Sequence, residues 1–481
     1  MLLGIDIGTT HCKVGLFAPD GGAVHIAVRP TDYAPDALWA AVDDALAEIT
    51  RVAGLESVAA IGISSMAETG LLLDCATGEA RTPFLPWFDR CAEAEAIAIA
   101  RESDAYERFC RTGLRINYKS GLAKLLWLQA QGADFTGAVW LSAADYVAYR
   151  LTGAMATDPT LAARTFAFDI AAGTWDAEWL ARWRLTPAHF PPVLPSGTTL
   201  VGLRASLHGL KPGIPVAVAG HDHVCAAFAA GATTPGVIFD SLGTAETLVG
   251  ARPTQPLGER DYASGFIYGP HVIPGCQFWM SSLSASGGSV EWARALLSDT
   301  PLSYADFVAL VAAAGPDPTG IVYAPYLAGS GAPRANPAAH AVFAGLTAPH
   351  TRAHLAKAVL EGTAYEVESM RRAAEALTGQ PITAFIVAGG GEKNPHWLHI
   401  KADVSGCTLH AYEQIEATLL GAALLAGVGA GVYVDHAAAQ AVLNVDSGIV
   451  YHPDKQRHAR YRVIYEQQYI PLQTFLLEHA S

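Results

Sequence analysis

A glycine–threonine turn near the start of the chain carries residue types that hold phosphate groups. Gly8-Thr9-Thr10 follows the apolar run Leu2–Ile7, which contains one carboxylate, Asp6. A carboxylate without a partner inside an apolar strand is strongly unfavourable or takes up a proton, so Asp6 needs a partner such as a metal-bound water network. The turn itself offers backbone N–H groups and hydroxyls to phosphate oxygens. The alternative is an aspartate that only caps a tight turn.

A similar turn sequence occurs near the middle of the chain. The segment Gly8–Gly15 and the segment Gly243–Gly250 share Gly-Thr and Val-Gly at the same spacing, and each follows an apolar stretch with an aspartate, Asp6 or Asp240. Self-similarity of this kind indicates two related domains. Two such loops facing one another across a cleft would grip a polyphosphate from both sides.

A cluster of titratable residues follows a second apolar run. The strand-like segment Val216–Ala219 leads into Gly220-His221-Asp222-His223, and the ends of strands are where α/β proteins place their sites. Asp222 could act as a general base that takes a proton from a substrate hydroxyl. Two alternatives stay open: a structural turn, and metal-dependent hydrolysis, because His221 and His223 would share one face of a strand as zinc ligands can.

In a third segment, a strand-like run ends in three glycines. Ile386–Ala388 is followed by Gly389-Gly390-Gly391 and then by a helix-like stretch that includes Asn394. Glycines permit close approach of the backbone to a flat or anionic ligand, although three glycines can also be a flexible connection. The chain contains neither a P-loop motif nor a His-Arg-Asp protein-kinase loop, which excludes those two mechanisms.

Alternating helical and strand-like patterns must position these groups. The patterns predict helices over Ala37–Ala53, Ala94–Phe109, His354–Leu377 and Thr418–Ala426, and strands over Val58–Ile63, Ala138–Leu141, Ile214–Ala219, Gly236–Leu242 and Ile382–Val387. This alternation indicates an α/β protein. A glycine-bounded stretch at 231–236 predicts a boundary between an N-terminal domain, residues 1–233, and a C-terminal domain, residues 234–481.

Composition excludes several classes of partner. The 481 residues are 51% hydrophobic and 16% charged, and the net charge of −14 would repel a nucleic-acid backbone. Seven scattered cysteines without a Cys-x-x-Cys pair fit a reducing cytoplasm. The longest weakly polar run, Leu419–Val434, is shorter than the roughly 20 residues of a membrane span. We therefore expect a cytoplasmic protein that binds neither nucleic acid nor membrane; a homodimer is compatible with the sequence.

Taken in chain order, these segments resemble the FGGY family of carbohydrate kinases, which belong to the actin- and hexokinase-like ATPases. The resemblance covers nearly the whole chain. The motifs that carry it are Gly4–Thr10, Trp87-Phe88-Asp89-Arg90, Gly220–His223, Ser241–Thr244, Tyr326–Arg334, Gly345-Leu346-Thr347 and Gly389–Gly391.

The resemblance implies two ribonuclease-H-like domains that close on Mg-ATP and on a sugar or polyol. It implies that Asp222 is the catalytic base and that Asp6 holds magnesium-bound water. It places the phosphate and adenosine contacts at Thr9, Thr10, Lys13, Gly243, Thr244, Gly390, Gly391 and Asn394. Phosphoryl transfer needs an in-line hydroxyl, neutralised phosphate charge and exclusion of water, all of which domain closure can supply.

The acceptor side departs from familiar members. Ser65–Thr69 stands where glycerol kinases carry Asn-Gln-Arg-Glu-Thr, so that Ala67 replaces the arginine that holds glycerol. The lost side chain leaves room for a four- to six-carbon ketose or sugar alcohol, with a pentulose such as xylulose first. Glycerol or erythritol, and a non-kinase actin-like ATPase, are the alternatives.

We expect charged groups beside an aromatic face to bind the acceptor hydroxyls. The candidates are Glu68, Thr69, Trp87, Asp89, Arg90 and His223. Packing in the core is the alternative for Trp87, and a surface ion pair is the alternative for Asp89 and Arg90.

Overall fold

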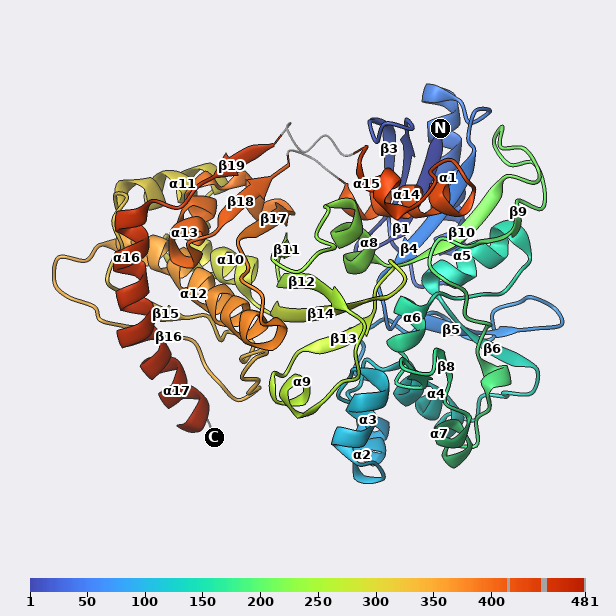
Figure 1. Cartoon of the computed structure of the whole chain (residues 1–481), viewed down its shortest axis with the longest axis horizontal. Helices are drawn as coiled ribbons and strands as arrows, with labels where there is room; N and C mark the ends of the chain where they lie inside the picture. The colour runs from blue at the N-terminus through green and yellow to red at the C-terminus, as the bar shows by residue number, and fades with distance from the viewer. Residues whose placement is uncertain (413–415, 443–447, 480–481) are drawn as a thin grey trace.

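Two β-sheets organise the chain, one in each half (Figure 1). The computed structural model describes residues 1–412, 416–442 and 448–479. In sheet order the first sheet contains β3 (Ala23–Pro30), β2 (His11–Phe17), β1 (Leu2–Ile7), β4 (Ala60–Ser65), β10 (Pro215–His221) and β9 (Thr199–Gly202). The second contains β13 (Ile267–Pro270), β14 (Cys276–Leu283), β12 (Glu246–Pro253), β11 (Val237–Leu242), β17 (Ala384–Ala388), β18 (Thr408–Ala411) and β19 (Ile449–Tyr451).

Among the described residues, three short strand pairs lie outside these sheets. They are β5 (Gly70–Asp74) with β6 (Ala138–Ser142), β7 (Phe168–Asp169) with β8 (Thr174–Trp175), and β15 (Val322–Ala324) with β16 (Val342–Ala344).

The two large sheets repeat one topology. In the first, β1 pairs antiparallel with β2 and parallel with β4, which pairs parallel with β10. In the second, β11 pairs antiparallel with β12 and parallel with β17, which pairs parallel with β18. The strand order β3-β2-β1-β4-β10 thus matches β14-β12-β11-β17-β18. The two glycine–threonine turns close equivalent hairpins, and the α/β prediction with two sheet-containing domains is confirmed.

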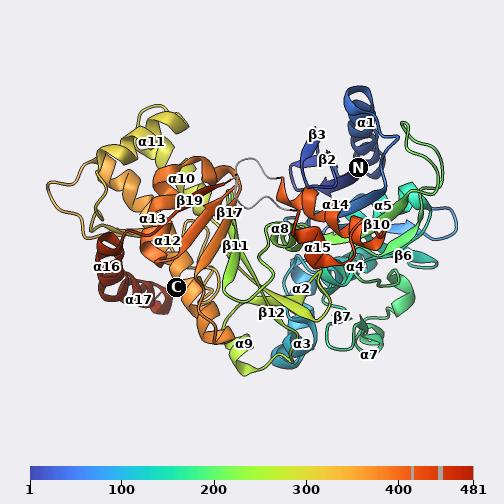
Figure 2. The same ribbon diagram turned by 45° about the horizontal axis from the view of Figure 1, so that its top comes forward.

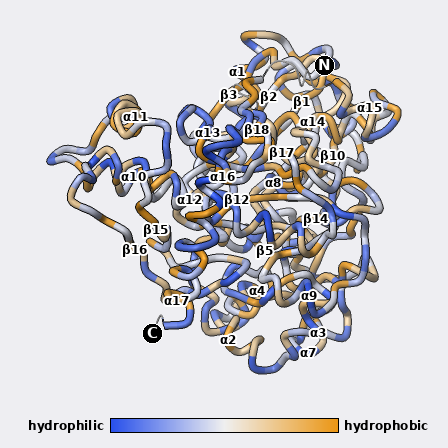
Figure 3. The backbone as a smooth tube through the Cα atoms, turned by 60° about the vertical axis from the view of Figure 1, so that its left-hand side comes forward, coloured by the Kyte–Doolittle hydropathy of each residue, from blue (hydrophilic) through white to orange (hydrophobic). Residues whose placement is uncertain are grey.

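Helices surround the two sheets, and some of them, such as α11 (Tyr304–Ala313) and α16 (Lys455–Ile464), pack on other helices. In the first half they are α1 (Pro35–Ala53), α2 (Glu93–Arg101), α3 (Ala105–Thr112), α4 (Gly121–Ala130), α5 (Ala143–Thr152), α6 (Pro159–Ala163), α7 (Ala177–Arg182), a 3-10 turn η1 (Pro187–His189) and α8 (Asp222–Ala229). In the second they are α9 (Glu259–Ala263), α10 (Ser286–Leu296), α11 (Tyr304–Ala313), α12 (Arg352–Thr378), η2 (Gly390–Lys393), α13 (Pro395–Ser405), α14 (Ala417–Gly429), α15 (His436–Gln440), α16 (Lys455–Ile464), a π-helical turn (Tyr465–Tyr469) and α17 (Ile470–His479). Figure 3 shows hydrophilic stretches around α16, an outer helix of the second half. The side chain of Tyr461 on this helix is nevertheless buried.

One predicted helix is wrong in extent. The single helix expected over Ala94–Phe109 divides into α2 and α3, because the Asp104 side chain accepts a hydrogen bond from the backbone N–H of Glu107 (2.8 Å) and caps a new helix. The other predicted helices and strands lie within a few residues of their observed bounds.

Helix α14 belongs to the second half in sequence but packs on the first sheet. In Figures 1 and 2 this late helix, drawn in orange, lies among the blue strands. A Cβ atom on Gly4 would lie 2.2 Å from the carbonyl oxygen of Leu419, and one on Gly62 would lie 1.9 Å from that of Ala422. Strand and helix backbones therefore meet directly at these two glycines. Across the described ranges, no helix combines the length and apolarity needed to cross a bilayer.

Candidate functional site

The carboxyl ends of three parallel strands bring the first group of polar residues together. Asp6 lies near the end of β1, Ser64 near the end of β4, and Asp222 directly after β10. The hydroxyl of Ser64 donates a hydrogen bond to Oδ1 of Asp6 (3.1 Å). This edge of a parallel sheet is where α/β proteins bind ligands.

Asp6 is a buried carboxyl with no cation in direct contact among the described residues. The pKa of Asp6 is raised to about 8, first by burial and then by the negative charge of Asp222, whereas the charge of Lys13 lowers it. A carboxyl held in this way binds a proton or a cation. No set of three His, Cys, Asp or Glu side chains in the described part of the chain is placed to hold a metal. Magnesium does not need one, since it retains waters and takes further oxygens from substrate phosphates.

Asp222 has the opposite electrostatic character. Nε2 of His221 lies 3.1 Å from its Oδ1, and the backbone N–H of His223 donates to the same oxygen (2.7 Å). Burial opposes the charged form, but the two histidines and these hydrogen bonds outweigh burial and lower the pKa of Asp222 to about 2. Asp222 is therefore a carboxylate at neutral pH and can accept a hydroxyl proton.

The predicted histidine pair on one strand face is wrong. His221 ends β10, whereas His223 lies in the first turn of α8, and their rings are nearly perpendicular at 5.6 Å. The change from strand to helix at Asp222 turns the two rings away from a common face.

A buried hydroxyl supports the turn that carries Asp222. The backbone N–H of His221 donates to Oγ1 of Thr160 (2.7 Å), and that hydroxyl donates to Asp158 (2.9 Å). A Cβ on Gly220, whose φ is 133°, would lie 2.6 Å from the same Oγ1. Glycine is therefore required here, which explains why it precedes the His-Asp-His cluster.

The first turn is fixed by contacts from other loops. Thr9 accepts a hydrogen bond at Oγ1 from Nε1 of Trp87 (2.8 Å), and Thr10 is exposed. Lys13 forms an ion pair with Glu416, the residue before α14, at 2.6 Å. Trp87 is half-buried and contacts this turn, so it does more than fill the core.

The second turn opens onto a large cavity. Every residue expected to contact the second phosphate loop and adenosine lines it: Gly243, Thr244, Gly390, Gly391 and Asn394. Its volume, about 710 Å³, is in the usual range for small-molecule sites. Apolar atoms of Val290, Val308 and Trp397 contribute to the wall, with Tyr304 and Lys393 beside them.

The backbone at this cavity is closely packed. The N–H of Gly287 donates to the carbonyl of Gly243 (3.1 Å) and that of Gly288 to the carbonyl of Thr244 (2.9 Å), which brings the start of α10 against the turn. Gly389 has a φ of 113°, and a Cβ there would lie 2.7 Å from the carbonyl oxygen of Leu242. The glycines thus let two loops and a helix terminus meet around one cavity.

A buried ion triad lies at this second hairpin. Lys401 bonds to both Asp240 and Glu246, and the hydroxyl of Ser286 donates to Glu246 (2.5 Å). All three charged side chains are almost fully buried. Asp6 and Asp240 hold related places in the two hairpins, but Asp240 already has a cation. This difference could not be predicted from local patterns, because Lys401 lies about 155 residues or more from both carboxyls in the chain.

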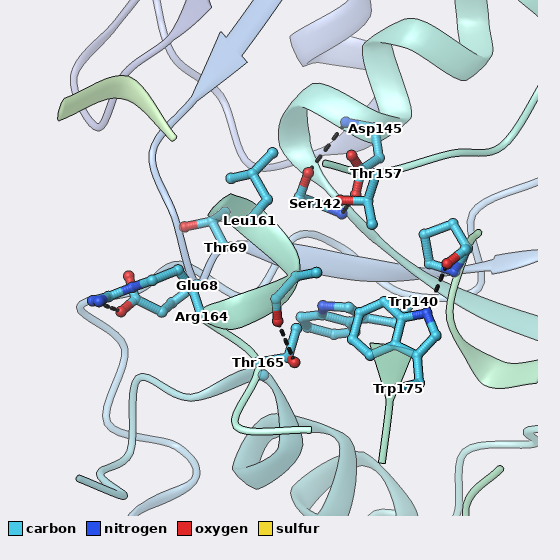
Figure 4. A pocket seen from close by; sticks show the side chains of 13 residues that line it. Glu68, Thr69, Trp140, Ser142, Asp145, Thr157, Leu161, Arg164, Thr165 and Trp175 are labelled. Atoms are coloured by element: carbon cyan, nitrogen blue, oxygen red, sulfur yellow. Dashed lines mark hydrogen bonds and ion pairs between the residues drawn. The ribbon is translucent and has the colours of Figure 1, made fainter. Parts of the chain in front are cut away.

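The loop after β4 carries two acceptor candidates. Glu68 has a φ of 59°, and its carboxylate forms an ion pair with Arg164, toward which it points in Figure 4. Thr69 accepts a hydrogen bond at Oγ1 from the backbone N–H of Trp87 (3.0 Å). A cavity of about 20 Å³ beside this pair has room for about one water.

Lys124 is a positioning residue that the sequence did not reveal. Its fully buried ammonium donates to the main-chain carbonyls of Glu68 (2.6 Å), Leu85 (3.1 Å) and Pro86 (2.8 Å). Burial lowers its pKa to about 8. Lys124 thereby joins the loop of Glu68 to the loop that carries Trp87.

Asp89 and Arg90 lie at the surface beside this group, and the guanidinium of Arg90 lies over the ring of Tyr118, 5.0 Å from its centroid. Both are exposed; Arg90 pairs with Glu93 at 2.5 Å rather than with Asp89, which accepts a hydrogen bond from the N–H of Cys91 (2.9 Å). Within the described residues, no hydrogen bond or ion pair joins either side chain to Glu68 or Asp222. His223 is half-buried beside Asp222, and burial lowers its pKa.

Comparison with known proteins gives matches along most of the chain. Residues 1–229 match the N-terminal domain of the FGGY family of carbohydrate kinases, and residues 241–430 match the C-terminal domain. The chain is 29% identical over 458 residues to a glycerol kinase of Gloeobacter violaceus, covering 92% of this chain and 91% of that one. A glycerol kinase of Citrifermentans bemidjiense is 32% identical over 460 residues, 90% of each chain. A crystal structure of xylulose kinase from Rhodospirillum rubrum superimposes with a TM-score of 0.87 at 28% identity, covering 99% of both chains.

Proposed function

Because the chain belongs to the FGGY family of carbohydrate kinases, we propose that it transfers the γ-phosphoryl group of Mg-ATP to a hydroxyl of a small sugar or polyol. Members of this family are ATP-dependent phosphotransferases with an alcohol group as acceptor, and this chain is one of them. The observation that supports the proposed site is the placement of Asp6 and Asp222 at the carboxyl ends of β1 and β10, the two parallel strands on either side of β4. One carboxyl there lacks a cation and the other is held charged.

Asp222 is the proposed catalytic base. As the acceptor oxygen forms its bond to the γ-phosphorus and the bond to the β-phosphate bridging oxygen breaks, Asp222 accepts the hydroxyl proton and ADP leaves. A carboxylate of low pKa suits this task because the proton is transferred late, when the acceptor oxygen has already become acidic. His221 and the backbone of His223 hold the carboxylate in place.

We place the nucleotide against the two glycine–threonine turns. Thr9, Thr10 and Lys13 would contact phosphate oxygens from the first half, and Gly243 and Thr244 from the second. Gly390, Gly391 and Asn394 would bind adenosine in the cavity of about 710 Å³, whose volume and lining residues support this assignment.

Asp6 fits a magnesium ion through its waters. Its carboxyl is buried, has a raised pKa and lies in the field of Asp222, so a divalent cation would relieve an unfavourable arrangement. When bound, magnesium neutralises charge on the phosphate oxygens.

For the acceptor we propose a four- to six-carbon compound, with a pentulose such as xylulose first. Ala67 is small and buried next to Glu68, where a longer side chain would occupy space. Glu68, Thr69, Trp87, Asp89, Arg90 and His223 are the proposed contacts. Glycerol is the alternative, and the two curated relatives named above, both glycerol kinases, favour it.

Three further proposals concern the whole molecule. We propose a domain division between residues 233 and 234, a cytoplasmic location, and a homodimer. None of them affects the chemistry at Asp222.

Coupled ADP release with Mg-ATP tests the function. The panel contains glycerol, erythritol, pentitols, pentuloses, hexuloses and the matching aldoses, and Asp222→Asn is the control. We expect one acceptor class to raise turnover far above background and the variant to abolish that increase. Turnover of ATP that no acceptor changes would contradict the proposal.

A further inference from the structure

We propose that Lys119 recognises an oxidised carbon of the acceptor, either a ketone carbonyl or a carboxylate, in preference to the corresponding alcohol carbon (CHOH or CH2OH). This inference rests on the proposed phosphorylation of a small sugar and narrows its substrate class. Lys119 was not among the residues that the sequence indicated.

The ammonium group of Lys119 lies over an aromatic face of the acceptor region. Its Nζ is 4.8 Å from the ring centroid of Trp87 and 5.9 Å from that of Tyr118. Trp87 is held by its hydrogen bond to Thr9, so its ring has a fixed direction. A ligand that reaches this face of Trp87 therefore meets a cation as well as an aromatic surface.

Lys119 has no carboxylate and no hydrogen-bond acceptor for its ammonium within the described residues. Its side chain is nevertheless partly buried, and burial is the main cause that lowers its pKa. The charge of Glu68 raises this pKa and that of Arg164 lowers it, which shows that the three groups lie within each other's fields. A half-buried ammonium without an acceptor is costly unless a ligand provides one.

The neighbouring charges do not supply that acceptor. One oxygen of Glu68 is engaged by Arg164, which leaves one oxygen for a ligand hydroxyl. Arg164 itself is buried, and its Nε and Nη1 have no hydrogen-bond partner in the described part of the chain. Lys119 and Arg164 thus share the field of a single carboxylate, so this part of the site has an excess of hydrogen-bond donors and of positive charge.

An oxygen that only accepts hydrogen bonds matches this excess. A carbonyl or carboxylate oxygen offers lone pairs and brings no proton that needs its own acceptor, whereas a hydroxyl brings one. A carboxylate would also gain from the positive charge, and its hydrogen bond would be charge-assisted on both sides. The shared chemistry is therefore an oxidised carbon, carried by a ketose in one case and by a sugar acid in the other.

Matched acceptors that differ at one carbon test this inference. The pairs are dihydroxyacetone with glycerol, ribulose with ribitol, xylulose with xylitol, xylonate with xylitol, and gluconate with sorbitol. Coupled ADP release gives kcat/KM for both members of each pair in wild type, in Lys119→Met and in Lys211→Met. Lys211 is an exposed lysine between β9 and β10 and serves as the matched control.

We expect wild type and Lys211→Met to prefer the oxidised member of at least one pair by about tenfold or more, the effect of one charge-assisted hydrogen bond. We expect Lys119→Met to remove most of that preference, mainly through the KM of the oxidised acceptor. Lys119→Arg keeps the charge and the donors, so it should restore part of the preference. A preference confined to the ketose pairs would identify a ketone as the group that Lys119 binds, and a preference confined to the acid pairs would identify a carboxylate.

Two results would overturn the inference while leaving the kinase intact: a preference for the reduced members, or an equal loss for both members in Lys119→Met. Thermal unfolding of Lys119→Met distinguishes a lost contact from a misfolded loop. If the variant is unfolded, a Lys119→Gln variant that folds and keeps the full preference also overturns it. A panel on which no acceptor stimulates ADP release overturns the proposed function and this inference together.

Discussion

Nζ of Lys13 lies 2.6 Å from Oε2 of Glu416, although the two residues are 403 positions apart. The pair joins β2, beside the first glycine–threonine turn, to the segment that returns from the second sheet and begins α14. Both side chains are about one-third exposed, so the pair is open enough to exchange partners. A phosphate group that binds Lys13 would compete with Glu416 for this ammonium.

This competition predicts opposite effects of two substitutions on ATP binding. Lys13→Met should raise the KM for ATP by about tenfold, because a charge-assisted hydrogen bond is lost. Glu416→Gln should lower it by about two- to threefold, since a partly exposed ion pair contributes little. Initial-rate measurements at saturating acceptor check both, with the exposed Glu56→Gln as control. An unchanged KM in Lys13→Met would remove Lys13 from the phosphate site.

Asp222→Asn tests the base. We expect kcat to fall by about 10²–10⁴-fold, the usual contribution of a positioned general base, with little change in nucleotide binding measured by calorimetry. Because the pKa of Asp222 is about 2, wild-type turnover should show no acid limb from this group above about pH 4. An activity near that of wild type in the variant would mean that another group takes the proton.

The lowered pKa of Lys124 predicts that the KM for the acceptor depends on pH above neutrality. Its pKa is about 8, so above this pH the ammonium loses a proton and one of its three carbonyl contacts. The KM for the acceptor should rise between pH 7 and 9.5, whereas the KM for ATP should change less. In Lys124→Met the acceptor KM should be high at every pH and should lose this rise; a rise of the wild-type size in the variant would assign it to another group.

The lowered pKa of Lys124 also predicts how the free energy of unfolding changes with pH. The folded-state pKa of Lys124 lies below its ordinary value of 10.5, so between about pH 8 and 10.5 the unfolded chain binds more protons. The free energy of unfolding of wild type, relative to Lys124→Met, should therefore increase with pH over this window. Urea unfolding at several pH values measures it.

Lys401 predicts a large loss of stability. In Lys401→Met the buried carboxyls of Asp240 and Glu246 lose their cation, and we expect the free energy of unfolding to fall by about 3–5 kcal/mol. Adding Asp240→Asn to that variant removes the repulsion and should recover part of the loss. The exposed Lys455→Met is the control. A loss equal to that of the control would show that the triad does not support this hairpin.

Local patterns in the sequence were enough to place the hairpins and their turns. Apolar runs that end in Gly-Thr or in Gly-His-Asp-His mark strand ends, and strand ends converge in α/β sheets, so Asp6 and Asp222 could be expected near one another. The same patterns indicated the glycine-lined cavity, because Gly243 and Gly390 follow neighbouring parallel strands.

Contacts between distant segments could not be predicted in this way. Glu68 and Arg164 are 96 residues apart, and three carbonyls meet Lys124 through loops whose paths no local pattern fixes. The split of the helix at Asp104 was missed because continuous periodicity concealed a capping residue. The histidines were assigned to one strand because spacing does not show where a strand changes to a helix. The domain division at 233 stays a prediction.

The return of α14 to the first sheet has a consequence for synthesis of the chain. Ribosomes release the strands of the first sheet long before they release residues 417–429, which cover Gly4 and Gly62. These glycines present bare backbone that no side chain of their own can shield. During translation, we therefore expect the N-terminal half to remain incompletely folded and protease-sensitive until nearly the whole chain has emerged. Truncation before α14 should yield an aggregation-prone fragment rather than an independent folding unit.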